Sequence, residues 1–286
     1  MNLSQGTESN SDITGDVDRG AISVLMSVYN DAEYVGQAVE SILNQSYGEF
    51  EFLITNDCSS DGSRGILKHY AERDERIALI DNEKNIGLTK SLNRMIERAQ
   101  NPFLARMDAD DIAMPDRFER QIKVFRYNPE VDIVFGDTVL IDKNGAEICR
   151  SWRPDEKTIL EVLPNRCYIP HPTVMMRKEA AQAVGGYDEE FWTGQDKDLW
   201  LRMLDAGKRF CYLPDILLEY RINPDSVRGY TGENYWFAVA NRCIWNRQKL
   251  KALRYVNHLD TCQKALILIK LVPPNVFYYY RQVGSS

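Results

Sequence analysis

Three carboxylates lie within four consecutive positions, at Asp108, Asp110 and Asp111. They come directly after FLARM (103–107), an apolar run that predicts a buried strand. Like charges this close need a compensating cation, and hard oxygen ligands select Mg²⁺ or Mn²⁺, which also bind water and substrate phosphates. The cluster therefore indicates a divalent metal site. The alternative is a solvated turn that caps the helix expected from Pro115, and this motif alone leaves both open.

A second polar segment, NDCSSDG (56–62), follows the predicted strand FEFLIT (50–55). A carboxylate at this place in an α/β sheet can accept hydrogen bonds from a ribose or a base. Asp57 and Asp61 can also cap the next helix, and because one cap is enough, one of the two is free for a ligand. The chain has neither a GxGxxG nor a GxxxxGK[ST] motif, which disfavours dinucleotide and P-loop binding.

Strands and helices alternate through the first half of the chain. The apolar run AISVLMSV (21–28) predicts a strand buried on both faces. The short connections predict βαβ units, a mostly parallel sheet and helices on both of its faces. Ligands bind at the carboxyl ends of such strands, where this chain repeatedly places polar residues. The predicted strands are 21–28, 50–55, 77–80 and 103–107, and the predicted helices are about 35–43, 62–73, 88–99 and 115–127.

The second half has a different pattern and predicts a mixed arrangement of strands and helices. Two apolar segments that flank Asn144-Gly145 predict a hairpin with its turn there. Further helices are expected near 156–163 and 196–206, and strands near 173–176, 209–213 and 217–222.

The two ends of the chain differ in composition from the rest. Residues 1–20 have almost no large apolar side chain and predict a disordered leader. Residues 226–286 are predicted to be a helical, basic extension, with nine Lys and Arg residues against two acidic ones from Arg228 onward. This extension is either a solvated helical face or a surface that docks on anionic lipid headgroups. The net charge of −7 for the whole chain argues against a nucleic-acid partner.

The cysteines and the lengths of the apolar stretches indicate the cellular compartment of the protein. The six cysteines form no CxxC pair, so neither a zinc site nor a disulfide framework is indicated, and a reducing compartment is expected. The longest apolar stretch, near 265–272, is far shorter than the about 20 residues that span a bilayer. These features predict a cytoplasmic protein. Docking of the basic extension would add peripheral contact at the inner face of the cytoplasmic membrane.

Five segments, taken in order, resemble the family 2 glycosyltransferases, which have the GT-A nucleotide-sugar-binding fold. The resemblance implies a GT-A catalytic domain over 21–225, with a nucleotide-sugar-binding half (21–128) and an acceptor-binding half (129–225). The segments that carry the resemblance are ISVLMSVYN, ITNDCSSDGS, NEKNIGLTKSLN, FLARMDADDIAMPDRFERQ and GQDKDLWLR, and the match as a whole runs from Ile22 to about Arg221.

The resemblance places a nucleotide-sugar donor at the carboxyl ends of the first strands. Carried over by position, Tyr29 and Asp57 contact the nucleotide base, and Asp31 lies at the adjacent rim. Asp108 and Asp110 correspond to the DxD pair of the family, with Asp110 as the direct ligand of Mn²⁺ or Mg²⁺ and Asp108 nearer the ribose. The metal then acts as a Lewis acid toward the leaving diphosphate.

Two further donor contacts are implied, by Asn85 and by Arg106, although Arg106 can instead pair with a neighbouring carboxylate. The chain departs from the family at Cys58, which replaces the usual glycine of an Asp-Gly-Ser motif. It also lacks the proline that is common before the Tyr-Asn pair. The cysteine bears on the local backbone conformation only.

The dipeptide Gln195-Asp196 resembles the acidic-pair motif of the family, in which the aspartate is the general base. An inverting displacement needs a carboxylate opposite the leaving group to take the proton of the acceptor hydroxyl. The resemblance gives this role to Asp196, with Asp198 as the second candidate. Without the resemblance, a helix cap is the simpler interpretation of Asp196.

Four residues are assigned to the acceptor or the diphosphate. His171, between two prolines, is either a structural group or a ligand of the metal or a phosphate. Arg221 ends a predicted strand and either holds the diphosphate or forms a surface salt bridge. Trp192 either stacks on an acceptor sugar or belongs to the core, and Gln195 lies beside the predicted base.

Together these features predict an inverting, metal-dependent hexosyltransferase. It would move a sugar from a nucleotide sugar, expected to be a UDP-sugar, to a saccharide or lipid-linked saccharide acceptor in surface polysaccharide biosynthesis. The alternatives are a nucleotidyltransferase, a hydrolase with two carboxylates, and a catalytically silent nucleotide-binding scaffold of the same fold. A nucleotidyltransferase would need a Gly-rich basic loop after the first strand, and residues 29–32 (YNDA) do not resemble one.

Overall fold

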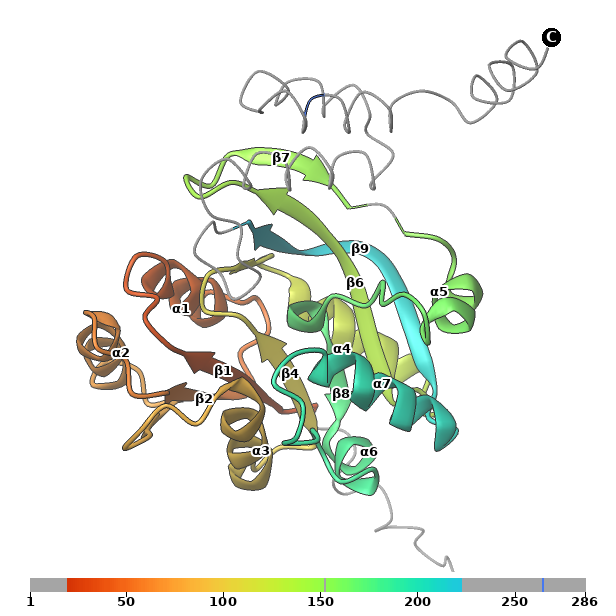
Figure 1. Cartoon of the computed structure of the whole chain (residues 1–286), viewed down its shortest axis with the longest axis horizontal. Coiled ribbons are helices and arrows are strands. Elements are labelled where there is room, and N and C mark those ends of the chain that lie inside the picture. The colour runs from red at the N-terminus through yellow and green to blue at the C-terminus, as the bar shows by residue number, and fades with distance from the viewer. Residues whose placement is uncertain (1–19, 152, 223–263, 265–286) are drawn as a thin grey trace, which may run out of the picture.

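The computed structural model describes residues 20–151, 153–222 and 264 (Figure 1). The predicted leader, except Gly20, and the predicted basic extension, except Lys264, lie outside the described residues. The strands are β1 (Ile22–Val28), β2 (Phe50–Asn56), β3 (Ile77–Asp81), β4 (Phe103–Met107), β5 (Ile112–Ala113), β6 (Ile133–Ile141), β7 (Glu147–Arg150), β8 (Met175–Arg177) and β9 (Phe210–Arg221). The helices are α1 (Val35–Leu43), α2 (Ser63–Ala71), α3 (Leu88–Arg98), α4 (Arg117–Tyr127), α5 (Glu156–Val162), α6 (Lys178–Ala183) and α7 (Gln195–Asp205), with a 3-10 turn η1 (His171–Thr173).

The described strands form one sheet with the order β3-β2-β1-β4-β8-β6-β9-β5, and β7 pairs with β6. Strand β1 pairs in parallel with β2 and with β4, and β2 pairs in parallel with β3. The register aligns Val28 with Asn56 and Asn56 with Asp81, so these strands end level with one another. The predicted parallel first half is confirmed, and the loops that leave these strands start from one edge of the sheet.

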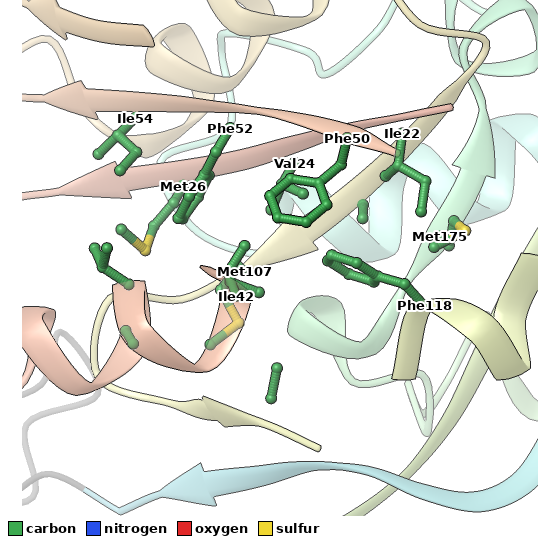
Figure 2. Packing of buried hydrophobic residues seen from close by; sticks show 14 of the residues in the cluster. Ile22, Val24, Met26, Ile42, Phe50, Phe52, Ile54, Met107, Phe118 and Met175 are labelled. Carbon is green, nitrogen blue, oxygen red and sulfur yellow. The ribbon is translucent and has the colours of Figure 1, made fainter. Parts of the chain in front are cut away.

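Helices cover both faces of the sheet, as the alternation of strands and helices predicts. One apolar cluster contains Val24 and Met26 of β1 together with residues of α1, α2 and α4. The opposite cluster contains Leu25 of the same strand together with residues of α3, α5, α6 and α7. Figure 2 shows part of the first cluster, with Met26 and Phe52 on the same side of the sheet as Ile42. Adjacent residues of β1 thus enter opposite cores, which explains why its sequence is continuously apolar.

The second half is mixed, as predicted. Strand β8 is antiparallel to both β4 and β6, whereas β6 and β9 are parallel and run side by side as the long strands of Figure 1. The prediction of two strands at 209–213 and 217–222 is wrong, because β9 is continuous. Its register with β6 passes from Leu213 opposite Gly136 to Ile216 opposite Asp137. A bulge takes up the extra residues without ending the strand.

Smaller differences concern short elements. The strand expected near 173–176 begins later, since residues 171–173 form η1. Helix α6 and strand β5 were not predicted, because six-residue and two-residue elements carry little periodicity. The predicted hairpin is confirmed, and Gly145 in its turn has a φ of 85°. No helix in the described part of the chain is long and apolar enough to cross a membrane.

Candidate functional site

The loops that follow β1 and β2 are tied together at the carboxyl edge of the sheet. The backbone N–H of Asp31 donates to Oγ of Ser63 (2.9 Å), and the N–H of Ala32 donates to Oδ2 of Asp61 (3.0 Å). The other carboxylate oxygen of Asp61 accepts the N–H of Ser63 at the start of α2 (2.9 Å). Asp61 therefore binds the backbone at the start of α2, which is the capping role that the sequence left open between Asp57 and Asp61.

Asp57 anchors the next loop of the same edge. Its side chain is buried, and its Oδ1 accepts hydrogen bonds from Nδ2 of Asn82 (2.8 Å) and the N–H of Ile86 (2.9 Å). Its Oδ2 accepts the N–H of Gly87 (2.8 Å). The carboxylate thus holds the loop after β3, which carries the exposed Asn85, against the end of β2. Base contacts by Asp57, by Asn85 and by Tyr29, which is 49% exposed, remain predictions.

Cys58 has a φ of 60°, in the left-handed region that glycine enters at little cost. We expect Cys58→Gly to raise the free energy of unfolding by about 1 kcal/mol, because it removes the steric conflict of a Cβ in this region. Thermal denaturation should then show a gain in Tm of about 2–4 °C. Cys58→Ser is the matched control, since it keeps the Cβ and changes only the thiol. An equal gain from serine would assign the effect to the thiol and not to the backbone.

The loops that follow β1 and β4 bring carboxylates together. Burial raises the pKa of Asp31 to about 6, and the charges of Asp108 and Asp61 contribute to the rise. Burial also raises the pKa of Asp110 to about 7, with further contributions from Asp108 and Asp31. The mutual repulsion expected from the sequence is therefore present. A cation at Asp110 and Asp108 would relieve this repulsion.

The carboxylates at this edge fit a metal ion whose coordination shell is completed by substrate oxygens. The described residues contain no group of three or more His, Cys, Asp or Glu side chains arranged to hold a metal by themselves. Mg²⁺ typically binds one or two carboxylates and completes its shell with water and substrate phosphates. Asp108 and Asp110, both partly exposed, could supply those carboxylates.

Arg106 lies behind the acidic loop and is only 2% exposed. Its guanidinium donates to Oδ1 of Asp108 (2.5 Å) and to the carbonyl oxygen of Met107. The structure thus shows the pairing with a neighbouring carboxylate, and the predicted contact of Arg106 with the nucleotide is not supported because the side chain is buried. Arg106 positions Asp108.

Arg221 is also buried, at the end of β9. The alternative of a surface salt bridge is wrong, because its guanidinium contacts carbonyl and amide oxygens beneath the acidic loop. These contacts leave a single N–H for any other acceptor, and a contact with the diphosphate remains a prediction. The acceptors are the carbonyls of Asp110 (2.8 Å), Asp142 (3.1 Å) and Lys143 (3.2 Å) and Oε1 of Gln37 (3.0 Å).

Helix α7 presents the predicted base in its first turn. Gly194 occupies the N-cap position with a φ of 77°, so the interpretation of Asp196 as the helix cap is wrong. Asp198 pairs with Arg202 (2.7 Å) one turn later. The carboxylate of Asp196, which is partly exposed, has no such hydrogen-bonded partner within the described ranges. Of the two candidate bases, Asp196 is therefore the one available to a substrate.

The loop before α7 lies on the edge that Asp57 organises. The indole of Trp192 is 3.1 Å from the position that a Cβ on Gly87 would take. Oγ1 of Thr89 donates to the carbonyl of Phe191 (3.0 Å). Trp192 is 74% exposed, so the alternative that it belongs to the core is wrong. Its stacking on an acceptor sugar remains a prediction.

His171 is buried inside the fold. This agrees with a structural role, which was one of the two interpretations that the sequence offered. Its Nε2 is 2.7 Å from the hydroxyl oxygen of Tyr187, and its ring packs edge-on against Trp200. Gln195 is also buried, and its Oε1 lacks a hydrogen-bond partner in the described part of the chain. Sequence reasoning missed Tyr187, because a single tyrosine outside any motif carries no signal.

This chain is similar to known proteins both in sequence and in fold. A family model described as glycosyl transferase family 2 matches residues 23–185. The O-antigen biosynthesis glycosyltransferase WbnJ of Escherichia coli is 35% identical over 213 residues, which cover 72% of this chain and 82% of that protein.

Two solved structures show the same fold at 16% sequence identity. S. aureus TarS 1-349 in complex with UDP-GlcNAc has a TM-score of 0.61 and covers 83% of this chain and 72% of its own. The mannosyltransferase PcManGT from Pyrobaculum calidifontis, in complex with GDP-Man and Mn²⁺, has a TM-score of 0.59 and covers 96% of this chain and 82% of its own. The predicted GT-A fold is confirmed.

Proposed function

Since this chain belongs to glycosyl transferase family 2, we propose that it is an inverting, metal-dependent enzyme that moves a hexose from a nucleotide sugar to a saccharide or lipid-linked saccharide. The O-antigen biosynthesis glycosyltransferase of Escherichia coli supports a place in surface polysaccharide biosynthesis. TarS with UDP-GlcNAc supports a UDP-sugar donor, and PcManGT with GDP-Man and Mn²⁺ keeps a GDP-sugar as the alternative.

One observation carries this proposal. The loop that leads into Asp196 packs, through Trp192, on Gly87, whose N–H is held by Asp57. A carboxylate that has no hydrogen-bonded partner among the described residues is thereby attached to the same edge of the sheet that carries Asp57 and the acidic loop. A sugar donor bound at this edge would lie beside the available base.

The reaction would proceed as a single displacement. The acceptor hydroxyl oxygen attacks the anomeric carbon of the donor, and Asp196 takes the hydroxyl proton as the new C–O bond forms. The bond between the anomeric carbon and the diphosphate oxygen breaks, and the nucleoside diphosphate leaves with the electron pair. A divalent cation held by Asp110 and Asp108 would supply charge stabilisation to the leaving diphosphate.

Calorimetric titration with UDP, GDP, CDP and dTDP, each with Mn²⁺ and with EDTA, tests the donor site. We expect one nucleotide to bind with Mn²⁺ and to lose its affinity in EDTA, because its diphosphate completes the metal shell. Binding unaffected by EDTA would remove the metal from the proposal, and no binding at all would favour the hydrolase. The product separates the remaining alternatives, since a nucleotidyltransferase releases pyrophosphate, a glycosyltransferase releases the nucleoside diphosphate, and a silent scaffold releases neither.

A further inference from the structure

A hydrogen-bonded pair of aromatic side chains, His171 and Tyr187, is buried between the acidic loop and the start of α7. Nε2 of His171 and the hydroxyl oxygen of Tyr187 are 2.7 Å apart, and the two side chains are 8% and 2% exposed. Neither side chain carries a role in the displacement described above. Because buried polar groups cost free energy unless they are paired, the two residues constrain each other's position.

One side of this pair faces α7. The ring of His171 packs edge-on against Trp200, with 5.9 Å between ring centroids. Trp200 follows Asp196 by four residues, so both lie on the same face of the helix. The segment before Tyr187 is bound to the same helix, because the guanidinium of Arg202 donates to the carbonyl of Gly186 (2.8 Å). The orientation of the first turn of α7 therefore depends on this packing.

The other side of the pair faces the acidic loop. Turn η1, which begins at His171, leads to Val174, whose carbonyl accepts the backbone N–H of Arg106 (2.9 Å). Burial raises the pKa of Tyr187, Arg106 opposes the rise, and the charges of Asp196 and Asp108 add to it. The phenol is thus within electrostatic reach of both the predicted base and Asp108.

Tyr187 is also fixed to α3 through its backbone. Its N–H donates to Oδ1 of Asn93 (2.9 Å), and its carbonyl accepts Nδ2 of the same asparagine (2.8 Å). A Cβ on the preceding Gly186 would lie 2.9 Å from that Oδ1, so glycine permits the approach. The backbone of Tyr187 therefore has little freedom, and this restricts the position of its hydroxyl.

We propose that His171 and Tyr187 are positioning residues that hold the first turn of α7, and with it Asp196, at a fixed place relative to Asp108. This inference rests on the proposed function, in which Asp196 is the base and Asp108 belongs to the donor site. The pair acts through Asp196 and touches no substrate. It should therefore influence the rate of the chemical step and leave nucleotide affinity unchanged.

The test uses Tyr187→Phe, which removes only the hydroxyl. Hydrolysis of UDP-GlcNAc and of GDP-mannose with Mn²⁺ is followed by release of the nucleoside diphosphate, and nucleotide binding is measured by calorimetry. We expect kcat to fall about 10- to 100-fold, because small displacements of a catalytic group have effects of this size. The Kd of the nucleotide should stay within about twofold, since the donor edge is unchanged.

Tyr212→Phe is the matched control. The Tyr212 hydroxyl also donates to a protein acceptor, Oδ1 of Asp137 (2.8 Å), but Tyr212 belongs to β9 and its acceptor to β6, so this hydrogen bond is separate from the one between His171 and Tyr187. We expect this variant to keep the wild-type kcat and Kd. An equal fall in kcat for both variants would overturn the proposal, because loss of any hydrogen-bonded tyrosine hydroxyl would then suffice.

A second comparison separates positioning from a general loss of stability. Asp196→Glu keeps the carboxylate but moves it by one methylene, so Tyr187→Phe should change kcat little in this background. Equal effects of Tyr187→Phe in both backgrounds would overturn the positioning role. Full activity of Asp196→Asn would instead overturn the proposed base, so the two failures are distinguishable.

Hydrogen exchange makes the test independent of turnover. Tyr187→Phe should speed amide exchange in residues 195–199 of α7 and leave α2 unchanged, because α7 packs on the pair through Trp200, whereas α2 packs on the opposite face of the sheet. Unchanged exchange in α7 would contradict the proposal even if no hydrolysis of either sugar nucleotide is detected.

Discussion

Asp196→Asn should lower kcat for sugar transfer by about 10²–10⁴-fold and leave nucleotide binding unchanged. The substitution keeps the size of the side chain and removes its ability to accept a proton from the acceptor hydroxyl. The carboxylate has no protein partner in the described residues, and Gly194 occupies the N-cap position, so little stability should be lost. Transfer is measured by release of the nucleoside diphosphate, and binding by calorimetry.

Asp205→Asn is the matched control for this prediction. It makes the same chemical change on the same helix, at the exposed C-terminal end of α7, and should leave transfer unchanged. Asp198→Asn distinguishes the second candidate base, whose carboxylate is paired with Arg202. A larger loss of transfer in Asp198→Asn than in Asp196→Asn would show that the base is misassigned.

Asp110→Asn should weaken Mn²⁺-dependent nucleotide binding by about 100-fold or more, since even indirect partners of metal ligands typically change affinity 10- to 100-fold. In the absence of metal, the same substitution should stabilise the fold. Burial and the charges of Asp108 and Asp31 raise the pKa of Asp110 to about 7, so its ionised form destabilises the fold at pH 8. A neutral asparagine removes this repulsion, and Tm of the metal-free variant should rise. Calorimetry measures the loss of nucleotide affinity, and thermal denaturation measures the rise in Tm of the metal-free variant.

Asp116→Asn serves as the control for Asp110→Asn. Asp116 pairs with Arg120 (2.5 Å) on the surface of the protein, and pairs of this kind contribute at most about 1 kcal/mol. Nucleotide affinity should not change. Wild-type affinity of Asp110→Asn with Mn²⁺ would show that Asp110 is not a metal ligand, whatever its effect on Tm.

The acidic loop is held from beneath by two buried arginines. Arg106 pairs with Asp108, and Arg221 binds the carbonyl of Asp110 through its side chain and Oδ1 of Asp111 (2.8 Å) through its backbone N–H. The second oxygen of the Asp111 carboxylate has no hydrogen-bond partner among the described residues. The positive charges of Arg106 and Arg221 therefore compensate part of the negative charge of the acidic loop. Asp31 and Asp110 keep raised pKa values and remain available to a cation.

Local pattern was enough to predict the first half of the fold and the edge that carries the site. A strand between two helical layers must be apolar at every position, so runs such as 21–28 are visible without any structure. Parallel strands also present their carboxyl ends at one edge. For that reason the polar residues after each run, including Asp31, Asp57, Asp108 and Asp110, could be assigned to one site from their order alone. The resemblance to a family added Asp196, which local pattern would have treated as a helix cap.

Only the tertiary structure decided which of the polar residues are free. Arg221 and Gln37 are 184 positions apart, and no periodicity of the sequence indicates that they meet. The sequence does not show whether an arginine is buried against protein oxygens or open to a diphosphate. It therefore offered the pairing of Arg106 with a carboxylate only as one of two alternatives, and it did not predict the buried contacts of Arg221. The same reason applies to the pairing of His171 with Tyr187. The sequence determined which residues lie at the carboxyl edge of the first strands, because that follows from local pattern and strand direction. Hydrogen-bond partners depend on contacts between distant segments and became visible only in the fold.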